Sequence, residues 1–189
     1  MSRLAARLAG LVLLLIAALG LSAPASAQAT ASSPHAEGTI LLERSAATPG
    51  DTFLGALRLK MAPGWHVYWK NPGDSGLPLE LIWTLPEGFE AGAIVYPTPE
   101  RIEIGPLANF GHHGRPAFLI PVTAPADAAP GSTATIGLTA TWLICEEICV
   151  PETASFSLSL PVGEAPAIVE AERALFSAAR GEAPAPYDA

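Results

Sequence analysis

Short segments in which apolar and polar residues alternate dominate this chain, and clusters of glycine and proline separate them. In residues 53–61 the apolar side chains occupy the odd positions, apart from Gly55, whereas Arg58 and Lys60 occupy even ones. Successive side chains of a β-strand point to opposite faces, so this pattern predicts a strand that is buried on one face. The 19 prolines and 17 glycines follow no period, which suits many short strands joined by turns.

The same alternation recurs from Gly38 onward and predicts about eight strands. Besides 53–61, strands are expected over 65–69, 79–85, 93–96, 118–122, 133–144 and 154–162. Turn clusters at roughly 8–12-residue spacing are typical of a β-sandwich. We therefore predict an all-β protein.

Four tryptophans, Trp65, Trp69, Trp83 and Trp142, stand at apolar positions of these alternating segments. Large apolar side chains at such positions are mostly buried, and we expect all four in the core. Tyr68 points away from the face of Trp65 and Trp69. We expect it on the surface or in a second core rather than at a functional site.

The first 27 residues have the features of an export signal. Arg3 and Arg7 precede an apolar run over 8–21, and Ala25 to Ala27 are small residues of the kind that signal peptidase accepts. The apolar run is shorter than the roughly 20 residues that a membrane-spanning helix needs, which disfavours the alternative of an uncleaved anchor. We expect cleavage after Ala27 and a location in the periplasm.

Composition divides the rest of the chain into three parts. Residues 28–37 are rich in Ala, Ser and Thr and are expected to be flexible. Residues 38–163 carry the alternating pattern and form the single domain that 189 residues suggest. Residues 164–189 are expected to form a short helix and a tail, because Pro166 stands near a helix start and Gly181 follows its end.

Charge and missing motifs exclude several classes of function. The net charge is −8, whereas a nucleic-acid-binding protein needs a basic face. The sequence contains no serine elbow, no HExxH and no phosphate-binding glycine loop, so it offers no hydrolase motif.

Cys145 and Cys149 are the only two cysteines of the chain. Four extended residues span about 13 Å, but a disulfide needs Cα atoms about 5.5–6 Å apart. The chain must therefore fold back if the two are bridged, and a tight loop over 146–148 would place them opposite each other on neighbouring strands. An exported protein meets an oxidising compartment in which such a bridge can persist.

In the loop-entropy model, a bridge over so short a loop contributes only about 2 kcal/mol of stability, less than a bridge between distant segments would. The residues alone leave open a structural bridge, a thiol–disulfide exchange site and a metal site. Glu146 and Glu147 are expected to raise the pKa of a neighbouring thiol, unless they merely solvate the hairpin tip.

Two alternatives to redox exchange remain. His112 and His113 could join Cys145 and Cys149 in a copper or zinc site, provided that the flanking glycines form a loop, because adjacent strand residues point to opposite faces. The second alternative is a non-catalytic sandwich that docks a membrane partner and whose disulfide is inert.

Two stretches, residues 64–78 (GWHVYWKNPGDSGLP) and residues 142–152 (WLICEEICVPE), resemble the N-terminal periplasmic domain of DsbD-type thiol:disulfide interchange proteins. They are most similar to the ScsB-like branch, which is linked to copper tolerance. The resemblance covers about residues 38–162. It implies an immunoglobulin-like β-sandwich in which Cys145 and Cys149 are the redox-active pair and Cys149 forms the mixed disulfide with partners. Phe110 and Gly111 match the loop that shields this pair in the family, although Phe110 also fits an ordinary packed loop aromatic.

The resemblance also implies a function. The domain would accept electrons from a thioredoxin-like partner and reduce disulfides of periplasmic thiol proteins, such as disulfide isomerases. It would thus act as a component of a protein-disulfide reductase and need no cofactor or metal. The cysteine spacing is C-x3-C, whereas better-known members have C-x5-C. The sequence shows one domain and leaves three alternatives open: a stand-alone relative of the family, a domain to which separate proteins such as a membrane electron-transfer protein supply electrons, or a fragment.

Overall fold

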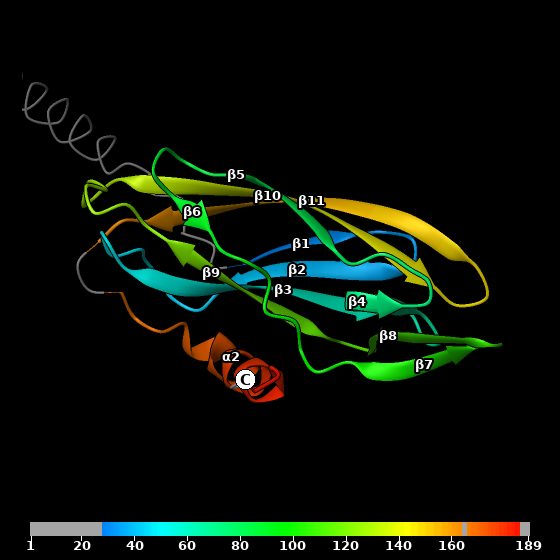
Figure 1. The fold of residues 1–189 in the computed structure, drawn as a ribbon. Helices are drawn as coiled ribbons and strands as arrows, with labels where there is room; N and C mark the ends of the chain where they lie inside the picture. The colour runs from blue at the N-terminus through cyan, green and yellow to red at the C-terminus, as the bar shows by residue number, and fades with distance from the viewer. Residues whose placement is uncertain (1–27, 164–165, 186–189) are drawn as a thin grey trace, which may run out of the picture.

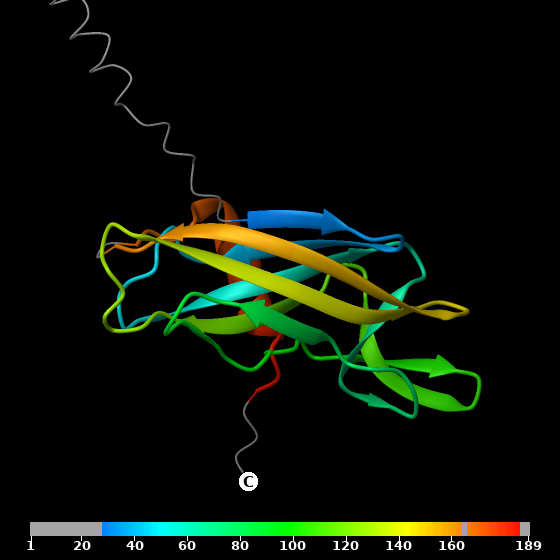
Figure 2. The same cartoon turned by 90° about the horizontal axis from the view of Figure 1, so that it is seen from above.

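A computed structural model describes residues 28–163 and 166–185. The predicted signal peptide, residues 1–27, lies outside the described residues. In the described part the chain folds into two antiparallel sheets that face each other, with a helix beside one of them (Figures 1 and 2). The predicted all-β sandwich with a short C-terminal helix is therefore confirmed.

The first sheet has the order β1-β2-β3-β9-β6. Its strands are β1 (Gln28–Ser32), β2 (Ala36–Leu42), β3 (Thr52–Met61), β9 (Ala117–Thr123) and β6 (Glu90–Ala91). The second sheet has the order β11-β10-β4-β8-β7. In addition, β5 pairs with residues 137–141 of β10, next to the end of β10 that pairs with β4. Its strands are β4 (His66–Gly73), β5 (Glu80–Thr84), β7 (Glu100–Ile104), β8 (Leu107–His113), β10 (Thr133–Cys145) and β11 (Cys149–Pro161).

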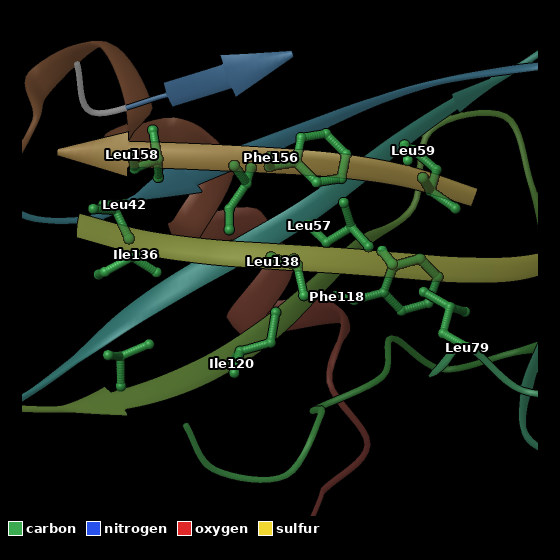
Figure 3. Packing of buried hydrophobic residues seen from close by; sticks show 14 of the residues in the cluster. Leu42, Leu57, Leu59, Leu79, Phe118, Ile120, Ile136, Leu138, Phe156 and Leu158 are labelled. Carbon is green, nitrogen blue, oxygen red and sulfur yellow. The ribbon is translucent and has the colours of Figure 1, made fainter. Parts of the chain in front are cut away.

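The core fills the space between the sheets (Figure 3). Leu57 and Phe118 from the first sheet pack with Leu138 and Phe156 from the second. Trp142 is fully buried there, and the other three tryptophans pack against the same cluster, as predicted from the alternation. β10 and β11 alternate between buried and more exposed residues over most of their length, which made them predictable from the sequence. Near the cysteines the alternation breaks down, and β11 begins five residues before the predicted start at residue 154.

The C-terminal helix covers the outer face of the first sheet. A 3₁₀ turn (Glu170–Glu172) leads into α2 (Arg173–Glu182), which begins later than the predicted start near Pro166. Phe176 and Ala179 of α2 form a second apolar cluster with residues of β2, β3 and β9, among them Ala56. In the alternation over residues 53–61, Ala56 lies on the same face of β3 as Arg58 and Lys60. The helix therefore buries part of the face that was predicted to be polar.

The N-terminal segment and the region of 93–113 differ from expectation. Residues 28–32 of the segment predicted to be flexible pair along β2, and the hydroxyls of Thr30 and Thr39 lie 3.2 Å apart. The strand predicted over 93–96 is reduced to a single bridge between Val95 and Leu119. In contrast, β7 and β8 were not predicted, because their burial does not follow a simple alternation.

Candidate functional site

The two cysteines close the hairpin between β10 and β11, which projects at one end of the sandwich (Figure 2). The strands stay in register from Thr133–Pro161 to Cys145–Cys149, so the cysteines lie directly opposite each other. They form a disulfide, with Cα atoms 4.1 Å apart. The Glu146 N–H donates to the Ile148 carbonyl at 3.1 Å and closes the turn. The predicted tight loop over 146–148 is confirmed.

The two sulfur-bearing residues differ in accessibility. Cys145 is 1% exposed, whereas Cys149 is exposed to solvent. Ile148, which precedes Cys149, is 66% exposed. The tip of the hairpin therefore presents one cysteine and one large apolar side chain to a partner, while it hides the other cysteine.

Tyr68 on β4 contacts the buried sulfur, contrary to the expectation of a surface or second-core tyrosine. Its hydroxyl donates to Cys145 Sγ at 3.3 Å and lies 3.7 Å from Cys149 Sγ. The ring is 1% exposed, and this burial raises the pKa of Tyr68, an effect that a hydrogen bond with Ser75 partly offsets. The alternation did indicate that Tyr68 lies opposite the core face. The pairing of β4 with β10, which no local pattern reveals, brings it to the cysteines.

The turn after β4 holds Tyr68 in place. Gly76 has a φ of +91°, and a Cβ there would lie 2.3 Å from the Tyr68 ring, so only glycine allows the turn to lie against the ring. Ser75 donates from its N–H and its hydroxyl to Asn109 Oδ1, at 2.9 and 3.0 Å. The Ala108 N–H donates to Asp74 at 2.8 Å. These bonds fasten the turn to β8.

A row of side chains crosses four strands next to the disulfide. Cys149 pairs with Cys145, Cys145 with His66 on β4, and His66 with His113 on β8. The rings of His66 and His113 lie 5.3 Å apart, and the His66 ring meets the edge of Tyr68 at 5.2 Å. His66 is 3% exposed, and its Nε2 has no hydrogen-bond partner among the described residues.

Glu100 on β7 adds a negative charge beside His113, at the end of this row. Its carboxylate accepts from the His113 N–H at 2.9 Å and lies 2.7 Å from His113 Nδ1. Burial alone raises the pKa of Glu100, but the hydrogen bonds and charge of His113 outweigh it and lower this pKa. Burial and the neighbouring His113 lower the pKa of His66, against an opposing effect of Glu100.

His112 and His113, which were predicted as possible ligands of one metal ion, lie on opposite faces of the second sheet. His112 is the next residue on β8, and its ring packs edge-on against Phe118 at 5.6 Å. Burial lowers the pKa of His112 to about 4. The segment is a strand and not a loop, so His112 and His113 point to opposite faces. Within residues 28–163 and 166–185, no group of three or more His, Cys, Asp or Glu side chains is arranged to hold a metal ion.

The two residues predicted to shield the cysteines also lie in β8 rather than in a loop. Gly111 pairs with Tyr68, and a Cβ at this position would lie 2.3 Å from the Val67 carbonyl oxygen. The structure thus brings Gly111 next to the site. Phe110 is half-buried and pairs with Arg101 of β7; by strand alternation it lies on the face of His112. The shielding role of Phe110 stays a prediction.

The acidic loop between the cysteines contacts the turn before β4. Both Glu146 and Glu147 are exposed. A Cβ on Gly64, whose φ is +86°, would lie 2.4 Å from Glu146 Oε1. The Glu146 carboxylate is therefore folded over Gly64. Its expected effect on the thiol pKa stays a prediction.

Comparison with known proteins decides the family of this chain. The family model for the N-terminal part of the thiol:disulfide interchange protein DsbD matches residues 37–161. The chain belongs to this family. The family and its solved relatives assign the sandwich to the immunoglobulin-like fold, as predicted. The domain is a thiol:disulfide interchange domain.

Two solved structures are similar to this chain, and the first of them shares its fold. The N-terminal periplasmic domain of ScsB from Proteus mirabilis is similar, with a TM-score of 0.63 at 18% identity. That match covers 84% of this chain but only 60% of the ScsB chain. The reduced DsbD N-terminal domain of Neisseria meningitidis matches with a TM-score of 0.39 at 16% identity and covers 68% of this chain and 89% of that one. No curated protein sequence matches the chain. In the part of the chain that the structure describes, no helix is long and apolar enough to cross a bilayer.

Proposed function

We propose that this domain accepts electrons from a thioredoxin-like partner in the periplasm and reduces disulfides of periplasmic thiol proteins through Cys145 and Cys149. The observation that carries this proposal is the asymmetry of the disulfide, with Cys149 exposed at a hairpin tip and Cys145 buried against Tyr68. A bridge that serves only stability does not require this division. The family and the predicted export signal support the location.

Each cysteine has its own step in the reaction. In the reduced protein, the Cys149 thiolate attacks a partner disulfide, and one partner sulfur leaves as a thiol after taking up a proton. Cys145 then attacks Cys149 Sγ, the bond between Cys149 and the partner breaks, and the second partner sulfur leaves. The partner gains two electrons and two protons, and the Cys145–Cys149 bond of the present structure forms. A dithiol of the thioredoxin-like donor reverses this sequence and restores the reduced protein.

Exposure also supports the proposed order of the two steps. A partner sulfur must approach its target in line with the bond that breaks, which requires access. Cys149 offers that access, whereas Cys145 contacts Tyr68 on its buried side. Cys149 is therefore the attacking residue and Cys145 the resolving residue.

Trapping of partners tests this function. Cys145→Ala removes the resolving thiol, so we expect mixed disulfides through Cys149 to accumulate and to appear as reducible adducts on gels of periplasmic extract. Cys149→Ala is the matched control and should trap little, because its remaining thiol is buried. Trapping by Cys149→Ala and not by Cys145→Ala would reverse the assigned roles, and no trapping by either variant would contradict the proposed exchange.

A further inference from the structure

The resolving step requires the buried Cys145 to lose a proton, and the row of side chains beside it offers an acceptor. We propose that the His66 imidazole accepts the proton of the Cys145 thiol and so generates the thiolate that resolves the mixed disulfide. This inference rests on the proposed function and names a residue for its second step.

Strand register places His66 beside Cys145. The two residues are direct partners where β10 pairs with β4. Directly opposed residues of antiparallel strands have Cβ atoms about 4.5–5.5 Å apart and point to the same face. Tyr68, two residues along β4, lies on this face too, and its hydroxyl contacts Cys145 Sγ at 3.3 Å. His66 and Tyr68 therefore lie on the face of the sheet that carries Cys145.

The hydrogen bonding of His66 is incomplete in the oxidised protein. Its Nε2 is buried without a hydrogen-bond partner among the described residues. Most buried polar atoms are paired, and an unpaired one calls for an explanation, such as a redox or catalytic role. A disulfide sulfur carries no proton, whereas the thiol of reduced Cys145 does. Reduction thus creates a proton donor on the residue that pairs with His66, whose Nε2 lacks a partner among the described residues.

The surroundings of His66 favour the neutral ring that can accept a proton. Burial and His113 lower its pKa, and the Glu100 carboxylate opposes them. The titratable groups that face His66 are Cys145 on β10, Tyr68 on its own strand, His113 on β8 and Glu100 on β7. Near neutral pH the ring is therefore uncharged, and one of its two nitrogens carries no proton and can accept one.

Cys145 needs such help more than Cys149 does. Only the thiolate attacks a disulfide, and burial of a thiol in apolar surroundings disfavours its ionisation. Cys145 is 1% exposed, so solvent has little access to its proton. In the proposed step the proton moves from Cys145 to His66, the new thiolate bonds to Cys149 Sγ, and the partner sulfur leaves with the electron pair of the broken bond. His66 then releases its proton to the departing sulfur or to water.

The reaction of the reduced protein with 5,5′-dithiobis-(2-nitrobenzoate) separates the two steps, because each step releases one coloured thiolate. In His66→Gln we expect the first release, by Cys149, to stay within twofold of the wild-type rate. The second release, by Cys145, should slow by at least tenfold near neutral pH, in line with the rate contribution of a proton acceptor. A second release within twofold of wild type would overturn the proposal.

The pH profile distinguishes a proton acceptor from a structural residue. In the wild type, the second release should accelerate as pH rises through the pKa of His66 and then level off. In His66→Gln this step should instead keep accelerating as the thiol ionises directly. An identical profile in both proteins would also overturn the proposal.

A second variant keeps the test valid if His66→Gln fails to fold. His113→Gln, at an exposed position in the next strand, removes a neighbour that lowers the pKa of His66. We expect its second-release profile to shift to higher pH with an unchanged plateau, and an unshifted profile would count against His66. The small disulfide probe needs no natural partner, so the failure of this inference is distinguishable from a failure to trap partners with Cys145→Ala.

Discussion

At the scale of single residues, the two bridged cysteines have different environments. Cys149 meets solvent at the tip of the hairpin, whereas Cys145 receives a hydrogen bond from the buried Tyr68 hydroxyl. Cys145 becomes a thiolate in the resolving step, and a hydrogen bond to a thiolate is stronger than one to a neutral sulfur, because the acceptor is charged. Tyr68 therefore stabilises the thiolate through which Cys145 resolves the mixed disulfide.

Tyr68→Phe tests this effect. Loss of the hydroxyl should slow the second release of coloured thiolate from 5,5′-dithiobis-(2-nitrobenzoate) by about fivefold, the equivalent of about 1 kcal/mol. The absorbance of the released thiolate measures the rate. Tyr96→Phe is the matched control, since Tyr96 is also buried but packs against Phe118 in the core. Equal slowing in both variants, or a second release within twofold of the wild-type rate in Tyr68→Phe, would contradict the assigned role of the hydroxyl.

Sequence reasoning reached some of these residues and not others. It found both cysteines and the turn that joins them, because a local bridge over three residues permits little else. It missed Tyr68 and His66 because their proximity to Cys145 depends on the pairing of β4 with β10, two strands far apart in the sequence. It placed Phe110 in a loop because the family has a shielding loop there, whereas residues 107–113 of this chain form a strand in which Gly111 is required by close contact with Val67.

At the scale of elements, the long β10–β11 hairpin depends on a buried carboxylate near its tip. Glu152 of β11 is 5% exposed and accepts hydrogen bonds from the Ser33 hydroxyl and from the N–H of His35, whose Nδ1 lies 2.6 Å from it. The His35 ring in turn stacks on Trp65 at 3.7 Å. The turn between β1 and β2 is thereby fixed to the second sheet, which explains why the segment predicted to be flexible is ordered.

Glu152→Ala should lower the free energy of unfolding by about 1–3 kcal/mol, because it removes the buried carboxylate that accepts hydrogen bonds from the partly buried Ser33 and His35. Urea denaturation measures the change. Thr153→Ala, at the neighbouring exposed position, should stay within about 0.5 kcal/mol of wild type. Equal stabilities of Glu152→Ala and the wild type would show that the carboxylate does not fasten the turn.

At the scale of the whole molecule, the sandwich presents a redox pair at one end of a rigid frame. The alternation along most of β10 and β11 made these strands predictable, whereas β7 and β8, which pair with each other across a short turn, lack such a pattern. The two apolar clusters pack the sheets and the helix together, and hydrogen bonds fix the turns. This packing keeps Cys145 buried and leaves Cys149 accessible at the tip of the hairpin. This arrangement suits electron transfer by contact between proteins, and it depends on a disulfide that opens and closes.

The equilibrium reduction potential of the Cys145–Cys149 couple tests this account most directly. It is measured in the purified protein against glutathione buffers, with metal ions excluded. The account predicts a value between about −180 and −270 mV, the range of proteins that exchange disulfides. A value below about −300 mV, which is typical of structural disulfides, would contradict it and favour a non-catalytic docking domain.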